Sequence, residues 1–165
     1  MEYLIEISYK PGFFDALGHN ILKDIKDMGI SGTTKVKTAQ LYLINGDLSQ
    51  NDAILICKEL LTDKITQQYN IKIQGTGYRV QGITPKPYPL TPNPCFIVQV
   101  WYKKGVTDAV ADTVKKGAAD LGVKAIDTIK TGQEYTITGK ISAEKVREIA
   151  EGLLSNKVIQ DYIIK

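Results

Sequence analysis

Apolar and polar residues alternate along two short segments, one at the start of the chain and one past its middle, which predicts two strands. Residues 3, 5, 7 and 9 of the first segment are apolar or aromatic, and so are residues 96, 98, 100 and 102 of the second. Alternation with a period of two marks a strand that has one face on a hydrophobic core. Similar alternation over residues 69–73 and 162–164 predicts a last strand in each half of the chain.

Helical spacing of apolar residues follows each of the first two strands and predicts a helix there. The apolar positions are Leu17, Ile21, Ile25 and Met28 in the first half and Val110, Val114, Ala118 and Leu121 in the second. Asp15 and Asp108 are candidate N-caps, and Gly29 and Gly122 are candidate C-terminal stops.

A second helix is predicted in each half after Ser49 or Ser142, because serine is a favoured N-cap residue. The apolar positions that follow are Ala53, Ile56, Cys57, Leu60 and Leu61, which correspond to Val146, Ile149, Ala150, Leu153 and Leu154. Between the two helices lie residues 36–44 and 129–137, which are broken near Ala39 and Gly132. Each break predicts a hairpin of two strands.

The whole pattern repeats after 93 residues without a gap, so that Gly12 corresponds to Gly105 and Gly46 to Gly139. The order strand, helix, strand, strand, helix, strand predicts an α+β fold of two tandem ferredoxin-like repeats. Each antiparallel sheet then carries its helices on one face, and the repeats pair as an internal dimer. We expect repeat 1 over residues 1–74, a linker rich in glycine and proline over residues 75–94, and repeat 2 over residues 95–165.

The second face of each predicted sheet carries apolar residues that need a cover. Leu4, Leu41 and Leu43 point there in repeat 1, and Ile97 and Trp101 point there in repeat 2. Because such a face is too apolar to stay in water, we expect the two repeats to cover each other there. For Trp101 this repeat interface is favoured over the alternative of a residue that stacks on a ligand.

Charge and composition exclude several function classes. The net charge of +3 comes from lysines that alternate with acidic residues, and the basic strip around Lys35 lacks interleaved aromatic residues, so nucleic acid is not an expected partner. The sequence shows no membrane-spanning run and no signal peptide, and we expect a cytoplasmic protein without a membrane partner. Two cysteines are too few for a disulfide scaffold or a zinc site, and Cys57 is expected to be a buried, inert thiol.

Catalytic chemistry finds little support, so we expect no catalytic, metal or cofactor-binding residues. His19 is the sole histidine and is expected to be solvated on the polar side of its helix. Residues 78–83, Tyr-Arg-Val-Gln-Gly-Ile, resemble the phosphate loop of acylphosphatases, but they follow a complete repeat where that loop would precede the first helix. An acylphosphatase-like hydrolase is therefore a remote alternative to a β-extension within the linker.

Two short motifs resemble the PurS family, the small subunit of phosphoribosylformylglycinamidine synthase. Residues 12–18, Gly-Phe-Phe-Asp-Ala-Leu-Gly, are similar to the family's entry into the first helix. Residues 153–162 resemble its closing pattern, Leu-Leu-x-Asn-Pro-Val-Ile-x-x-Tyr. The departures are Ala16, Ala109, Lys64 and Lys157, which stand where the family has proline, and Asp63, which stands where it has asparagine.

The resemblance implies a dimeric, non-catalytic subunit that bridges a synthetase (PurL-like) subunit and a glutaminase (PurQ-like) subunit. The enzyme converts formylglycinamide ribonucleotide, glutamine and ATP into formylglycinamidine ribonucleotide in purine biosynthesis. A tandem chain would supply the dimer in one piece, since linking two modules gives an effective concentration near millimolar. Association of tandem chains into a further homo-oligomer stays open.

Six residues at the two predicted hairpin tips are candidate partner contacts: Lys37, Thr38, Gln40, Lys130, Thr131 and Gln133. They recur in both repeats although a turn requires only its small residue, but a solvated turn is an equal alternative. A competing function is a regulatory module resembling ACT domains, which would bind a small effector near the loops of Gly12 and Gly105.

Overall fold

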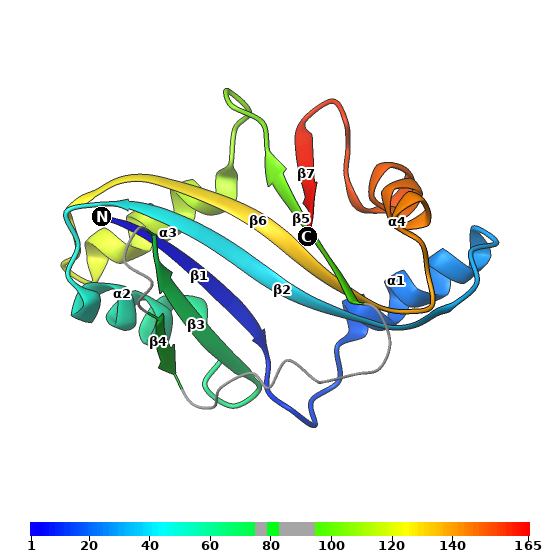
Figure 1. Ribbon diagram of the computed structural model, residues 1–165. Helices are drawn as coiled ribbons and strands as arrows, with labels where there is room; N and C mark the ends of the chain where they lie inside the picture. The colour runs from blue at the N-terminus through cyan, green and yellow to red at the C-terminus, as the bar shows by residue number, and fades with distance from the viewer. Residues whose placement is uncertain (75–78, 83–94) are drawn as a thin grey trace. The chain divides into compact units, whose positions relative to one another are not determined.

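The computed structural model describes residues 1–74, 79–82 and 95–165 (Figure 1). The described chain divides into two compact units. The first unit contains Met1–Phe13, Gln40–Pro85 and Thr107–Thr131, and the second contains Phe14–Ala39, Lys86–Val106 and Gly132–Lys165. Each unit therefore takes one segment from the other repeat. We call residues 14–39 and 107–131 the exchanged segments.

The strands of the first unit are hydrogen-bonded in the order β4-β3-β1-β2-β6. Only the second half of β2 and the first half of β6 belong to this unit. Its strands are β1 (Glu2–Tyr9), β2 (Thr33–Gly46), β3 (Gln67–Ile73), β4 (Arg79–Gly82) and β6 (Ile126–Gly139). Its helices are α2 (Gln50–Ile56), the π-helical turn η1 (Cys57–Leu61) and α3 (Ala109–Asp120). β1 and β3 are antiparallel, with Ile5 opposite Ile71.

The strands of the second unit are hydrogen-bonded in the order β2-β6-β5-β7. Only the first half of β2 and the second half of β6 belong to this unit. It adds the strands β5 (Cys95–Tyr102) and β7 (Gln160–Ile164). Its helices are α1 (Ala16–Asp27), α4 (Ala143–Ile149) and the π-helical turn η2 (Ala150–Leu154). β5 is antiparallel to both neighbours, with Val98 opposite Tyr135 of β6 and opposite Ile164 of β7.

The predicted hairpins are wrong, because β2 and β6 are uninterrupted strands of 14 residues each (Figure 1). The positions where the sequence predicts a break, Ala39 and Gly132, instead lie where each strand passes from one unit into the other. A hairpin would return the chain to its own repeat, whereas a continuous strand carries it onward. Each unit still has the predicted ferredoxin-like set of elements, with one helix and one half-strand from the other repeat.

Each hydrophobic core joins side chains from both repeats. In the first unit the helix residues Val114 and Ala118 of repeat 2 pack with Ile56 and Cys57 of repeat 1. In the second unit Ile21, Ile25, Ile30 and Val36 of repeat 1 pack with residues of repeat 2 that include Val98, Ile137 and Ile149. Neither repeat can therefore complete a core without the exchanged segment of the other.

The helix boundaries confirm the predicted caps. Asp15 accepts a hydrogen bond from the Gly18 N–H at 2.8 Å, and Asp108 accepts one from the Ala111 N–H at 3.0 Å. The Ser49 hydroxyl caps α2 and forms a reciprocal pair with Asp52. Gly29 and Gly122 end the first helices with φ angles of 78° and 90°, which glycine adopts without steric cost.

The second face of the sheet is buried at its centre. Leu41 is only 1% exposed although it belongs to neither core under the helices, while Leu4, Leu43, Ile97 and Trp101 are half-buried. The ring of Trp101 lies over Gly132, where a Cβ atom would come within 2.7 Å of it. Mutual cover of this face by the two repeats stays a prediction.

Most of the predicted linker, residues 75–78 and 83–94, lies outside the described residues. Arg79–Gly82 form β4, which is antiparallel to β3 with Val80 opposite Ile71. This confirms the β-extension for these four residues and places them beside a strand, where the phosphate loop of an acylphosphatase would precede a helix.

Candidate partner-contact site

The six predicted contact residues lie within β2 and β6, not at hairpin tips. Lys37, Gln40 and Lys130 are exposed. Thr38 and Thr131 are only 8% and 7% exposed. Lys37, Gln40 and Lys130 therefore face solvent, whereas the two threonines are buried within the fold.

Thr38 binds the carboxylate that caps α1. Its N–H donates to Asp15 Oδ2 at 2.6 Å, and its hydroxyl lies 3.0 Å from both carboxylate oxygens. The same carboxylate accepts from the Gly18 N–H, and a Cβ atom on Gly18 would clash with the Val36 carbonyl oxygen. Asp15 thus fixes the start of α1 against β2 within the exchanged segment.

Thr131 repeats this arrangement with Asp108 in the other exchanged segment. Its N–H donates to Asp108 Oδ2 at 2.8 Å, and its hydroxyl lies 2.9 Å from both oxygens. Gln133 is also engaged, since its Nε2 donates to the Ala39 carbonyl at 2.9 Å. The recurrence of Thr at these positions is explained by the helix cap, so we do not assign the two threonines to a partner.

Replacing Thr38 with valine should destabilise the protein by about 1.5–3 kcal/mol, the usual value of a hydrogen bond to a charged group. Thr131→Val should cost about as much, and the two losses should add because the two clusters share no residue. Urea unfolding measures both. Thr34→Val is the matched control, since the exposed Thr34 hydroxyl donates only to the Thr138 carbonyl. An equal cost for Thr34→Val and Thr38→Val would contradict this role.

A turn that the sequence analysis did not select offers a more exposed surface. Residues 63–66 lead from η1 into β3, and Asp63 Oδ1 accepts from the N–H groups of Ile65 and Thr66 at 2.9 and 2.8 Å. These hydrogen bonds, that from Thr66 first, lower the pKa of Asp63. Lys10 Nζ closes the turn by donating to the Lys64 carbonyl at 2.6 Å.

Residues 156–159 form the same turn in the other repeat. Asn156 Oδ1 accepts from the Val158 N–H at 3.0 Å, and Lys103 Nζ donates to the Lys157 carbonyl at 2.5 Å. We call residues 63–66 and 156–159 the contact turns. Each presents one aliphatic side chain to water, Ile65 at 75% and Val158 at 81% exposure.

A lysine flanks the aliphatic residue in both contact turns. Lys64 Nζ pairs with Glu59 at 2.9 Å, and Lys157 Nζ pairs with Glu151 at 2.8 Å. Exposed ion pairs of this kind add little stability. An exposed aliphatic side chain beside a lysine therefore occurs in both contact turns, each of which is held by a backbone N–H bonded to an Asp or Asn side chain and by a lysine bonded to a carbonyl.

Cys57 and His19 lie where the sequence predicts them. Cys57 is fully buried, and burial raises the pKa of its thiol to about 12, which confirms the inert thiol. His19 is exposed, as predicted, with its ring centroid 5.4 Å from that of Phe14. Within residues 1–74, 79–82 and 95–165, no group of three or more His, Cys, Asp or Glu side chains is placed to hold a metal ion.

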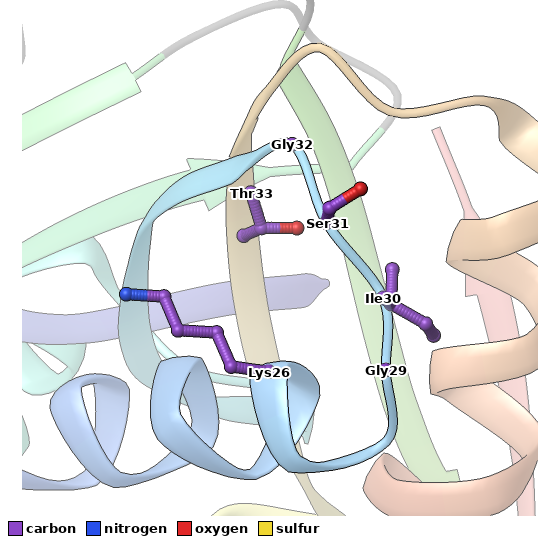
Figure 2. A pocket seen from close by; sticks show the side chains of 6 residues that line it. All are labelled: Lys26, Gly29, Ile30, Ser31, Gly32 and Thr33. Atoms are coloured by element: carbon purple, nitrogen blue, oxygen red, sulfur yellow. The ribbon is translucent and has the colours of Figure 1, made fainter.

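An open pocket of about 320 Å³ lies at the end of α1. Figure 2 shows the residues that line it, Lys26 and residues 29–33. The Thr33 hydroxyl is buried there without a hydrogen-bond partner in the described part of the chain. Repeat 2 has Ala119 and Ile126 where this pocket has Lys26 and Thr33. The Lys26 ammonium group and the Thr33 hydroxyl of the pocket therefore have no counterpart in repeat 2.

Comparison with known families matches residues 2–75 and residues 96–165 separately to PurS, described as phosphoribosylformylglycinamidine (FGAM) synthase. The chain belongs to the PurS family. It carries two tandem PurS copies, which confirms the resemblance seen in its motifs, and it is a subunit of an enzyme of purine biosynthesis. A comparison with curated proteins finds no match.

The departures from the PurS pattern leave the contact turns intact. Asp63 supplies the same side-chain acceptor as Asn156, so an aspartate can replace the asparagine. The carbonyls of Lys64 and Lys157, where the family has proline, still accept from Lys10 and Lys103.

Among the described residues, no helix is long and apolar enough to span a membrane.

Proposed function

We propose that this PurS chain is a non-catalytic bridge that holds the synthetase and glutaminase subunits of FGAM synthase in register. Glutamine hydrolysis then occurs on one partner, and ATP-dependent amidation of formylglycinamide ribonucleotide occurs on the other. The observation that carries the proposal is the pair of contact turns, because an exposed aliphatic residue beside a lysine occurs at the equivalent position of each PurS copy.

The contact turns suit docking for a physical reason. In each turn a backbone N–H donates to the side chain of Asp63 or Asn156, and a lysine that directly follows β1 or β5 donates to a carbonyl of the turn, so little conformational entropy is lost when a partner binds. Burial of an aliphatic side chain that is about three-quarters exposed supplies a favourable contact. The exposed Lys37, Gln40 and Lys130 are a second candidate surface.

The test is reconstitution of FGAM formation from the synthetase and glutaminase subunits, with glutamine or ammonia as nitrogen donor. We expect the chain to raise the glutamine-dependent rate and to affect the ammonia-dependent rate less, because free ammonia does not need aligned subunits. The double variant Ile65→Asp, Val158→Asp should lower the glutamine-dependent rate about tenfold or more, as expected when central apolar contacts of an interface are lost.

The matched control is Leu17→Asp with Val110→Asp, a pair of equivalent exposed residues on α1 and α3 at 44% and 51% exposure. This control variant should retain the glutamine-dependent rate of the unmodified chain.

Three other outcomes would change the proposal. If the control variant loses the glutamine-dependent rate and the contact-turn variant keeps it, docking occurs on the helices. Equal glutamine-dependent rates with and without the chain would reject the bridge. A loss confined to the variant with Lys37, Gln40, Lys130 and Gln133 changed to alanine would place docking on β2 and β6.

A further inference from the structure

The two units differ at one sheet edge. In the first unit β4 covers the outer edge of β3, whereas β7, the equivalent strand of the second unit, ends the sheet among the described residues. β3 and β7 correspond residue by residue, since Tyr69 aligns with Tyr162 and Ile71 with Ile164. The first unit therefore shows what this edge accepts, namely an antiparallel strand.

The hydrogen bonds of β7 show which groups face the open edge. Ile97 and Lys165 exchange both backbone hydrogen bonds, at 3.0 and 2.8 Å, and Lys103 N–H donates to the Ile159 carbonyl. Because bonded and non-bonded residues alternate along an antiparallel pair, Tyr162 and Ile164 direct their N–H and C=O groups away from β5. Their equivalents Tyr69 and Ile71 lie opposite Gly82 and Val80 of β4.

The side chains along β7 are complementary to those of a second β7 strand that runs antiparallel to it. Asp161 and Ile163 of β7 and Lys165, which directly follows β7 and still pairs with Ile97, alternate along one face, an acid and a base on either side of an isoleucine that is 51% exposed. In an antiparallel pair of two β7 strands centred on Ile163, Asp161 of each copy lies opposite Lys165 of the other. Opposite charges at directly facing positions stabilise such a pair, and like charges disfavour it.

We propose that β7 pairs with β7 of a second copy of this chain, antiparallel and centred on Ile163, so that the edge is closed by a two-fold contact. In this register Tyr162 faces Ile164 of the second copy, and these are the residues whose backbone groups point outward. Ile163 packs on its own equivalent. Both charged groups have a partner within the chain that the contact would replace or share, since Asp161 lies 3.8 Å from Lys103 and Lys165 Nζ donates to Gln99 at 3.0 Å. The Asp161–Lys103 pair is long and its carboxylate is 74% exposed, so Asp161 can turn toward a second copy.

The test is sedimentation equilibrium of the full chain from micromolar to millimolar concentration. We expect a reversible rise from the chain mass of 18.3 kDa to twice that value, because an interface of one short strand is small and the association is weak. A mass that stays at 18.3 kDa throughout would overturn the proposal. This outcome is independent of the bridging function, which is measured with the partner subunits.

Charge reversal tests the register. Asp161→Lys places lysines opposite each other, and Lys165→Asp places aspartates opposite each other, so each variant should weaken the dimer about tenfold or more. The double variant Asp161→Lys, Lys165→Asp restores opposite charges and should restore the dimer. Lys72→Asp is the matched control, because Lys72 is the equivalent of Lys165 on the strand that β4 covers. Dimers that ignore both reversals, or a double variant weaker than either, would contradict this register.

Discussion

A chain cut between its two repeats should remain one folded particle with the mass of the intact chain. The experiment replaces residues 86–91 with a specific protease site and cleaves it. The fragments should co-elute at 18.3 kDa by gel filtration with light scattering, and should separate only in denaturant. The reason is that each core needs the exchanged segment of the other repeat, so separation opens both cores.

The size of this effect follows from what separation would expose. Val114 and Ile25 are buried, each in a core that consists mostly of residues of the other repeat, and exposing one such aliphatic side chain costs about 1.5–3 kcal/mol. Either fragment alone should be unfolded or paired with its own copy. A folded monomer of residues 1–75, or fragments that separate at micromolar concentration without denaturant, would contradict the exchange.

The local elements could be predicted from the sequence because their signals are local. The cap residues and the alternation of the strands depend on a few neighbouring residues, and the structure confirms them at Asp15, Ser49 and Gly29. The exchange of residues 14–39 and 107–131 between the repeats could not be derived from local signals. A hairpin within one repeat and a continuous strand that enters the other unit bury the same residues against equivalent helices and strands. One signal did exist, since the stretch from Lys37 to Leu41 has no Asn, Asp, Gly or Pro to form a tight turn.

The candidate site shows a similar limit. Thr38 and Thr131 recur in both repeats, and recurrence alone does not distinguish a docking side chain from one that binds a helix cap. Ile65 and Val158 are aliphatic residues, which are most often buried, so their residue type alone favours a place in the core. Their exposure depends on the turn that Asp63 and Asn156 impose, and a side-chain acceptor two residues earlier is the signal that could have found it.

A charge placed in α3 of repeat 2 should expose a thiol in repeat 1. Cys57 and Ala118 are both fully buried in the core of the first unit. An unpaired aspartate at position 118 should cost at least about 4 kcal/mol, which raises the open population about a thousandfold. In a Cys95→Ser background, which removes the exposed cysteine, Ala118→Asp should raise the rate at which Cys57 reacts with a thiol reagent by about that factor.

The matched control is Ala119→Asp, the same substitution one position along α3 at an exposed residue, and it should leave the reaction slow. Cys57 suits this measurement because burial raises its pKa to about 12, so the thiolate forms only when the core opens. If each repeat folded by itself, Ala118→Asp would disturb the sole tryptophan, Trp101 of repeat 2, and would leave Cys57 unreactive. A fast Cys57 reaction in the Ala118→Asp variant alone therefore requires that α3 completes the core of the other repeat.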